Sequence, residues 1–484
     1  MRRIKKAAAP IVVLALVAAA CGGDDDAADE PAETPAPDDD APEPEPEPDD
    51  DAPEPDPDDD APEPTDPPDE APDVDPADIL TDIGVTDDVI RVGLNADLSG
   101  LFAPLVIQIV DAQEVYFEIL NDEGGIAGRQ IELVILDNEY DVPRHLENYE
   151  RMAGTGDEGV VIFSQSTGSP HTAATLDMLV QDELAAVALS WYSGLDDPSL
   201  AANVIKSQTN YCFEAMNGVE FLTEENDAQT LAIISFPGEY GEDGAVGAEI
   251  AAAELGLEVV YDGRGAVVPG ADQTPVVTSL VEANPDIVWA TLNPTTFAEV
   301  FGAAVAQGLE AQWSGSAPTF NFQLLGTDLG PAAEQFFTFS TYTALWDVDD
   351  TPGMREVVEG MRSKRPEAPV SDVYIRGWIE AMTAHQILEQ AARNGDMTRA
   401  GVVEAARQIE VDYKGLSPNQ VFAGEPNERA VRESYLYSID LDLFTPQLTV
   451  SDEGAGTGFV LERGPYVGSV AENFQFDEAC FIAG

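Results

Sequence analysis

Apolar positions follow two alternating patterns from about residue 79 onward. Short β-rich runs predict strands, and stretches whose apolar residues recur every three or four positions predict helices between them. The first set places strands at 90–94, 131–136, 160–163 and 185–189, with helices at 106–120, 143–155 and 172–182. After about residue 209 the same pattern restarts, with strands at 230–235, 257–261, 286–291 and 336–341 and helices at 243–255, 273–283 and 296–307.

Strands that are separated by single helices imply parallel sheets with right-handed crossovers. Two such runs predict an α/β fold of two doubly wound parallel-sheet lobes joined by a hinge. Because ligands of such sheets bind beyond the carboxyl ends of the strands, we expect the site in the cleft between the lobes. The predicted N-terminal lobe comprises 79–208 plus 342–410, and the C-terminal lobe comprises 209–341 plus 411–484 with a C-terminal tail.

The last third of the chain has a different pattern. Residues 354–361 and 373–392 have helical periodicity, and the second of these stretches is long and amphipathic. Residues 423–484 are rich in glycine, with short strand-like runs at 433–439 and 458–461.

The N-terminus has the pattern of an export signal. Four cations within Met1–Lys6 precede an uncharged apolar run, Ala7–Ala20, which is shorter than the roughly 20 residues that a membrane span needs. Small residues directly before Cys21 resemble the lipobox of bacterial lipoproteins. We therefore interpret 1–21 as a lipoprotein signal peptide whose Cys21 is lipidated, anchoring the protein on the outer side of the cytoplasmic membrane or in the periplasm. The alternative is an ordinary secreted protein with a stray cysteine.

Residues 22–78 are predicted to be a disordered tether. They contain 27 Asp or Glu and 16 Pro, without Lys or Arg, and no apolar face on which a core could form. Proline and like-charge repulsion both extend such a chain, to roughly 180 Å at ~3.1 Å per residue. The alternatives are calcium binding or a cell-wall interaction.

Charge excludes one class of partner. The 484 residues carry a formal charge of −70, which argues against nucleic acid because phosphate binding needs clustered cations. Residues 79–484 alone hold 65 acids and 18 bases, and we hypothesise that this surface reflects a saline habitat. Only three histidines (His145, His171 and His385) and three cysteines are present, so no metal site is expected.

Several short motifs resemble one family. Ile90–Leu94 followed by Asp97–Gly100, and then Asn121–Arg129 with its Gly-Gly-Ile-Ala-Gly-Arg ending, are similar to the opening of type I periplasmic solute-binding proteins. These are the branched-chain amino-acid and amide binders of ABC transporters. Glu239–Gly241 and Asn284–Val288 match later landmarks of the family. The resemblance covers about 88–422.

The resemblance implies a lipid-anchored, extracytoplasmic substrate-binding protein. It would capture a small polar solute (an amino acid, an amide or a small organic acid) and deliver it to the permease and ATPase of an ABC transporter. We expect no enzymatic activity and no cofactor, because no nucleophile elbow, P-loop or metalloprotease motif occurs in the sequence. The alternatives are a ligand-sensing receptor of the same fold and, less favoured, an exported enzyme.

The resemblance also implies the ligand-binding residues. Thr167 falls where relatives place a hydroxyl that holds the ligand's carboxylate, although the same loop also has the pattern of a plain helix N-cap. Trp191 and Tyr192 replace small residues, Ser193 keeps a hydroxyl, and Tyr240 is predicted to be a wall from the C-terminal lobe. The full predicted set is Ser99, Gly100, Gln165, Ser166, Thr167, Trp191, Tyr192, Ser193, Tyr240 and Asn293.

One departure from the family bears on the ligand. Amino-acid binders place a Glu near the position of Ala317 to pair with the ligand's ammonium, and no acid lies between Glu310 and Asp328. An ammonium that loses its water without a counter-charge is costly to bury. The ligand therefore either lacks an ammonium or finds its acid elsewhere in the chain.

The remaining two cysteines form an even pair. After lipidation of Cys21, Cys212 and Cys480 are predicted to form a disulfide, because an exported compartment is oxidising. The alternative is two buried free thiols. The sequence leaves open which solute is bound, its affinity, the oligomeric state and the role of the C-terminal tail.

Overall fold

The computed structural model of the protein describes residues 74–454 and 456–482. The predicted signal peptide with Cys21, and residues 22–73 of the predicted tether, lie outside the described residues.

The N-terminal lobe is built on a parallel sheet of five strands in the order β3-β2-β4-β5-β6. The strands are β2 (Val89–Ala96), β3 (Gln130–Asp137), β4 (Ile162–Thr167), β5 (Ala185–Leu189) and β6 (Val204–Ile205). The helices between them are α1 (Ala103–Asp122), α2 (Val142–Ala153), α3 (Ser169–Ala173) and α4 (Leu176–Gln181). The helix predicted at 172–182 is thus divided into two short ones. Gly124 and Gly125 end α1 with φ angles of 112° and 71°, which favour glycine.

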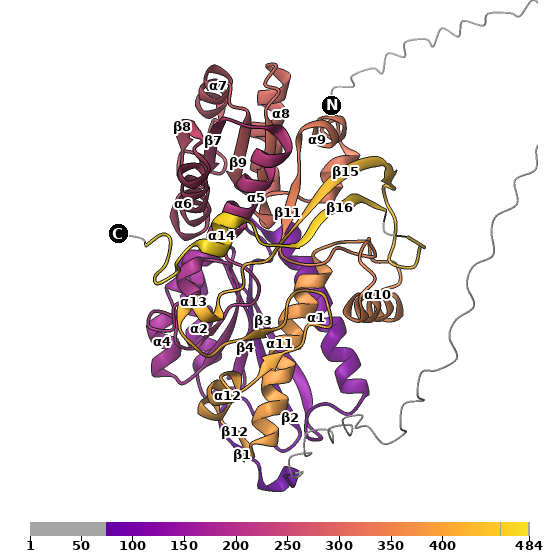
Figure 1. Ribbon diagram of the computed structural model, residues 1–484. Coiled ribbons are helices and arrows are strands. Elements are labelled where there is room, and N and C mark those ends of the chain that lie inside the picture. The colour runs from indigo at the N-terminus through magenta and orange to yellow at the C-terminus, as the bar shows by residue number, and fades with distance from the viewer. Residues whose placement is uncertain (1–73, 455, 483–484) are drawn as a thin grey trace, which may run out of the picture. The chain divides into compact units, whose positions relative to one another are not determined.

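The C-terminal lobe is built on a second parallel sheet, in the order β10-β9-β7-β8. Its strands are β7 (Thr230–Ser235), β8 (Glu258–Gly263), β9 (Ile287–Thr291) and β10 (Gln312–Gly315). Its helices are α5 (Tyr211–Asn226), α6 (Gly238–Leu255), α7 (Thr274–Ala283), α8 (Pro294–Ala306) and α9 (Gly330–Phe336). The predicted α/β fold class with parallel sheets in two lobes is confirmed (Figure 1).

The strand predicted at 336–341 does not extend the second parallel sheet. It is β11 (Phe339–Thr341), which pairs antiparallel with β15 (Ser434–Phe444), and β15 pairs antiparallel with β16 (Thr457–Tyr466). The fourth strand of the parallel sheet is instead β10, a run of four residues. The short β10 was not among the predicted strands.

After β11 the chain returns to the N-terminal lobe. It contains α10 (Pro352–Lys364), α11 (Tyr374–Arg393) and α12 (Arg399–Ala406), and α11 lies beside α1 (Figure 1). Gly377 permits this close approach, because a Cβ atom there would lie 2.2 Å from the carbonyl oxygen of Ile109. The close packing of the two helices fixes the position of residues at the start of α11.

Short elements complete the described chain. The 3₁₀ helices are η1 (Pro76–Asp78), η2 (Ser193–Asp196), η3 (Ala317–Thr319) and η4 (Phe322–Gly326), and the short α-helices are α13 (Pro426–Arg429) and α14 (Ser469–Asn473). The two-residue strands are β1 (Leu80–Thr81), β12 (Asp396–Met397), β13 (Glu410–Val411) and β14 (Gln420–Val421). Within residues 74–454 and 456–482, no helix is both long enough and apolar enough to cross a membrane.

The chain passes between the lobes three times: between β6 and α5, between β11 and α10, and between β14 and β15. Buried polar groups connect two of these passages. Gln420 Oε1 accepts from the backbone N–H of Gln208 at 2.8 Å, and its Nε2 donates to the carbonyl of Lys206 at 3.1 Å. The ammonium of Lys206 pairs with Asp196 at 3.2 Å, with both side chains fully buried. These contacts connect Gln420, in the two-residue strand β14, to residues 206–208 of the first passage.

Candidate functional site

A cavity lies beyond the carboxyl ends of the strands and is lined from both lobes. The N-terminal lobe contributes Phe102, Leu105, Val106, Ile109, Tyr140, Thr167, Gly168, Ser169, Leu189 and Trp191. The C-terminal lobe contributes Tyr211, Tyr240, Ala317, Pro318 and Phe320. A third group, from around the start of α11, is Asp372, Val373 and Arg376. The space between the atoms, the opening included, is about 570 Å³. Its position is the one expected for a doubly wound pair of lobes.

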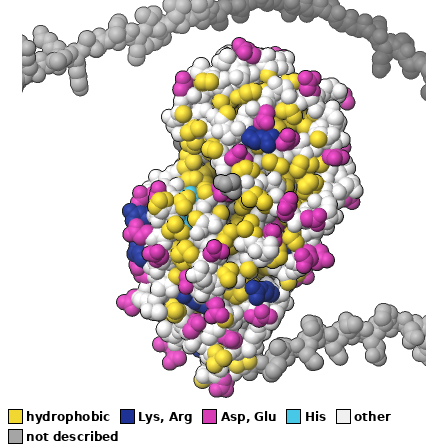
Figure 2. Space-filling model, turned by 90° about the vertical axis from the view of Figure 1, so that its left-hand side faces the viewer, with side chains coloured by type: hydrophobic (Ala, Val, Ile, Leu, Met, Phe, Trp, Pro, Cys, Tyr) yellow, Lys and Arg dark blue, Asp and Glu magenta, His cyan; other side chains and the backbone are white. Residues whose placement is uncertain are grey.

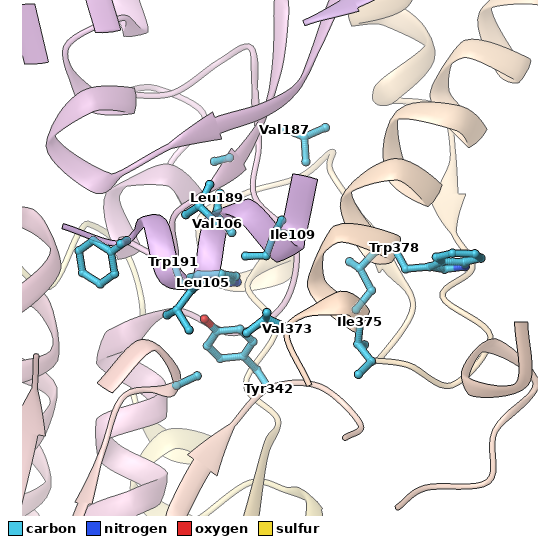
Figure 3. Close-up of a cluster of buried hydrophobic side chains, with 14 of the residues drawn as sticks. Leu105, Val106, Ile109, Val187, Leu189, Trp191, Tyr342, Val373, Ile375 and Trp378 are labelled. Atoms are coloured by element: carbon cyan, nitrogen blue, oxygen red, sulfur yellow. The ribbon is translucent and has the colours of Figure 1, made fainter. Parts of the chain in front are cut away.

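Most of the lining is apolar. Leu105, Val106 and Ile109 point from the first turns of α1 toward Leu189, at the end of β5, and toward Val373 (Figure 3). These side chains are all buried and belong to one hydrophobic cluster, so they form one apolar wall. A ligand in this cavity would exchange water for hydrocarbon over much of its surface.

Aromatic rings from both lobes close the cavity. Trp191 lies 4.5 Å from Tyr342, centroid to centroid (Figure 3). Its indole N–H donates to Gln208 Oε1 at 2.7 Å. In the C-terminal lobe, the ring of Tyr240 lies 4.7 Å from that of Tyr211. The same Tyr240 ring lies 5.9 Å across the cleft from the ring of Phe102 in the N-terminal lobe. The two lobes therefore meet ring against ring beside the cavity.

Three site residues were predicted after the third strand, Gln165, Ser166 and Thr167, and they differ in whether they reach the cavity. Thr167 lines the cavity, and its Oγ1 accepts a hydrogen bond from Gln165 Nε2 at 2.8 Å. Gln165 also accepts from Gln113, and the Ser166 hydroxyl lies 2.9 Å from Thr172 Oγ1, so both are buried behind the lining. Thr167 is thus the one of these three residues that faces the cavity.

The predicted pair Ser99 and Gly100 lies on the loop before Phe102 and outside the cavity lining. The Ser99 hydroxyl donates to Asp137 at 2.7 Å, and the Gly100 N–H donates to Asp97 at 2.6 Å. Asp97 also accepts from the N–H of Phe102, so these polar groups shape the turn that presents Phe102. Their ligand-binding role stays a prediction.

Ser193 and Tyr192 contact other parts of the chain rather than the cavity. Asp243 on α6 accepts hydrogen bonds from both the N–H and the hydroxyl of Ser193, which joins the two lobes. Burial raises the pKa of Asp243 to about 7. The Tyr192 hydroxyl donates to the carbonyl of Phe481 in the C-terminal tail at 2.6 Å.

Cys212 and Cys480 are joined by a disulfide with 268 residues of separation. Cys212 lies in the first turn of α5, and the N–H of Cys480 donates to the Ser193 hydroxyl at 2.9 Å. The tail is therefore covalently fixed to the C-terminal lobe and hydrogen-bonded to the N-terminal lobe, next to the junction between them.

Tyr240 and Asn293 are the two site residues predicted from the C-terminal lobe. Tyr240 lines the cavity, and its hydroxyl donates to the carbonyl of Leu292 and lies 2.9 Å from Ser316 Oγ. Asn293 caps α8 and donates across the cleft to the carbonyl of Leu101 at 3.3 Å. It forms a contact between the lobes and is not among the lining residues.

Two charged residues that line the cavity were not predicted from the sequence. Arg376 and Asp372 are 4% and 2% exposed, and both face the cavity from around the start of α11. The available signal was Arg376 inside the otherwise apolar run Val373–Ile379, with the opposite charge of Asp372 four residues earlier, just before that run. Charges among buried helix positions are uncommon unless they bind something.

The structure changes the argument about Ala317. Ala317 does line the cavity, and its own loop has no acid. Its N–H, however, donates to Glu214 Oε1 at 2.9 Å, so α5 brings an acid to the back of this loop. Asp372 is a second acid, and it faces the cavity directly.

The two buried histidines of the N-terminal lobe lie behind the lining. The ring of His171 is 4.4 Å from the ring of Tyr140 and 5.5 Å from His145. Burial lowers the pKa of His171 to about 4 and that of His145 to about 3, so both rings are neutral near pH 7. Within the described part of the chain, no cluster of His, Cys, Asp and Glu is placed to hold a metal ion.

Two doubly wound lobes that line one cavity between them define a binding protein that holds a small molecule between its lobes. The sequence profile described as periplasmic binding protein matches residues 89–443. The chain belongs to this family, the type I periplasmic binding proteins of ABC transporters, as predicted. These are extracytoplasmic substrate-binding proteins for small ligands.

Solved structures agree with this assignment. The chain is 27% identical to a fatty acid ABC transporter substrate-binding protein from Thermomonospora curvata, with a TM-score of 0.74 over 84% of this chain and 98% of that one. A substrate-binding protein from Aeropyrum pernix (17% identity, TM-score 0.66, 80% and 98% covered) shares the fold. So does a branched-chain amino acid transporter protein from Thermus thermophilus with bound valine (19%, 0.66, 80% and 97%). Among curated proteins, none matches this chain.

Proposed function

We propose that the protein is a lipid-anchored binding subunit that captures a small solute between its lobes and delivers it to an ABC permease. The observation that carries this proposal is that residues of both lobes line one cavity, as Thr167 and Tyr240 do. A ligand that contacts both walls binds the closed form better than the open form, and so shifts the equilibrium toward closure. The permease and its ATPase would then accept the closed form.

The lipid anchor at Cys21 and the tether of 22–78 belong to the same proposal. One lipid-modified cysteine replaces a spanning helix, and an extended acidic segment lets the lobes reach the permease from the membrane. The lobe boundaries predicted from the sequence near 208 and 342 are retained as part of this proposal, and the third boundary is moved from 410 to the passage between β14 and β15.

The solute is proposed to carry a substantial apolar part. Leu105, Val106, Ile109 and Leu189 offer hydrocarbon rather than hydrogen bonds. The fatty acid named for the Thermomonospora curvata protein and the valine bound by the Thermus thermophilus protein both have an apolar portion. Of the predicted ligand residues, Thr167, Trp191 and Tyr240 are the ones that we retain as solute contacts, because they line the cavity.

A thermal-shift screen of the purified chain tests this function. The panel contains branched and aromatic amino acids, amides, urea, and short and medium-chain carboxylates. A ligand that binds the native state adds to the free energy of unfolding by mass action, by about 2.7 kcal/mol at a concentration one hundred times Kd. The melting temperature rises accordingly. The absence of a shift with every solute would favour the sensory receptor or the exported enzyme.

Closure has its own measurement. Small-angle scattering with a saturating hit from the screen should give a smaller radius of gyration than the free protein. Trp191 supplies a second signal, since its indole lies in the cavity wall. An unchanged radius together with unchanged tryptophan emission would count against capture between the lobes.

A further inference from the structure

The guanidinium of Arg376 is a buried charge that lacks an ion-pair partner. Nη1 donates to the Tyr342 hydroxyl at 3.0 Å and Nη2 donates to Thr341 Oγ1 at 3.3 Å, whereas Nε has no hydrogen-bond acceptor. Among the described residues, no carboxylate oxygen lies within 4.0 Å of its nitrogens. A buried charge of this kind is strongly destabilising unless something pairs with it.

Aromatic rings hold this guanidinium at the edge of the cavity. Its central carbon lies 5.4 Å from the Trp191 ring centroid and 5.0 Å from that of Tyr342. The rings and the two hydroxyl acceptors fix the plane of the group without neutralising its charge. Arg376 is thus held ready for an anion that the chain itself does not supply.

The surrounding acids are poor counter-charges. Asp372 has one unpartnered oxygen, Glu380 accepts from Gln113 at 2.7 Å through one oxygen, and Glu214 accepts from the N–H of Ala317. Burial raises the pKa of all three carboxyl groups, and the charge of Arg376 only partly opposes that effect. Burial therefore disfavours a negative charge on the groups nearest to Arg376.

The rest of the lining is suited to an uncharged apolar body. Leu105, Ile109, Leu189 and Phe320 present hydrocarbon, so an ammonium lying against them would lose its water without replacement. Only Asp372 could pair with such an ammonium, and burial opposes its ionisation. The charge balance of the cavity consequently favours a ligand with one negative charge.

We propose that the ligand is a monocarboxylate with an apolar body and no ammonium, and that Arg376 binds its carboxylate. A carboxylate suits a guanidinium because its two oxygens can accept two parallel N–H···O hydrogen bonds in one plane. The assignment rests on the proposed solute-binding function and names the substrate class of the same cavity. It also places the anion on α11 rather than on the loop around Thr167, where the family resemblance had placed it.

The test uses matched probes on the purified full chain by isothermal titration. Hexanoate, octanoate and decanoate are each compared with the corresponding primary amide and the corresponding 2-amino acid. The acids should bind, and the amides should bind at least about tenfold more weakly, because a charge-assisted hydrogen bond contributes more than a neutral one. The 2-amino acids should bind more weakly still.

Variants assign the carboxylate to its partner. Arg376→Gln should weaken acid binding about 10- to 100-fold and leave the amide affinities near their starting values, which also shows that the cavity is still folded. Arg376→Lys should restore part of the acid affinity, because it keeps the charge but not the planar fork. Arg393→Gln, the same change at the exposed end of α11, is the matched control and should bind all probes like the parent protein.

The outcomes separate the substrate class from the function. If the 2-amino acids bind most tightly and Asp372→Asn abolishes that binding, the ligand is a zwitterion and the assignment is overturned, while solute binding stands. If acid binding survives Arg376→Gln, the carboxylate lies elsewhere and the assignment is again overturned. If no probe and no solute of the thermal-shift panel binds, the proposed function itself fails.

Discussion

The disulfide between Cys212 and Cys480 provides a direct test of how the C-terminal tail stabilises the fold. The tail follows β16, passes through α14 and contacts both lobes: Cys480 is bonded to α5, and the carbonyl of Phe481 accepts from Tyr192. Replacing both cysteines by serine removes the covalent link and leaves these hydrogen bonds in place. Comparison with the reduced parent protein then separates the loss of the cross-link from the cost of the hydroxyl buried at position 212.

The loop length sets the upper limit of the effect. With a sequence separation of 268, the chain-entropy relation gives about 5–6 kcal/mol. Measured values fall below this relation, because unfolded chains retain some compactness, and about 2–4 kcal/mol is typical. We therefore expect Cys212→Ser with Cys480→Ser to lower the free energy of unfolding by about 3 kcal/mol.

Urea denaturation provides the measurement, followed by tryptophan fluorescence and by far-ultraviolet circular dichroism. The two transitions must coincide before a single free energy is assigned, because the lobes could unfold separately. The double variant should be insensitive to dithiothreitol, and the reduced parent protein should match it. A variant within about 0.5 kcal/mol of the oxidised parent would refute the entropic argument. The tail contacts would then suffice without the cross-link.

Three further changes probe buried contacts. Lys206→Met strands Asp196 as a buried charge and should cost about 3–5 kcal/mol in urea denaturation, while adding Asp196→Leu should restore most of that stability. Because burial raises the pKa of Asp243 to about 7, the folded state keeps a proton that the unfolded state has released. Stability should therefore fall by up to about 4 kcal/mol as the pH rises from about 4 to about 7, and Asp243→Asn should flatten that part of the profile. Gly377→Ala should cost about 1–3 kcal/mol and also weaken ligand binding, because its Cβ would displace Ile109 from the cavity wall.

The alternation of strands and helices was predictable because each element has a clear local period. The helix α5 was not, since Tyr211 to Leu222 are buried on every side and show no polar face. The position of β11 beside β15 was also missed, because this pairing joins residues nearly a hundred positions apart. Local periodicity indicates where strands occur, but it does not identify their neighbours.

Part of the site was predictable from the sequence, because some of its residues lie at the carboxyl ends of predicted strands. Thr167 is the last residue of β4 and Trp191 lies two residues after β5, and the strand order brings such positions together. Gln165 and Ser166 lie one or two residues earlier, where the side chains are buried behind the lining. Arg376 lies in the part of the chain that folds back onto α1, so its proximity to the cavity depends on tertiary structure alone.

The acidic surface should affect how fast a carboxylate binds. Acidic side chains are spread over the face shown in Figure 2, and Lys and Arg occupy few places there. These charges repel an approaching anion over distances up to the screening length of about 8 Å at physiological salt. A ligand carboxylate about 4 Å from Arg376 is instead attracted by about 4 kcal/mol at an effective dielectric constant near 20. Stopped-flow mixing with hexanoate should therefore show an association rate that rises with ionic strength. The dissociation rate should change little, because screening acts weakly inside the closed cavity. An association rate that falls as salt is added would mean that a local positive field guides the anion, and the acidic surface would then have no part in ligand entry.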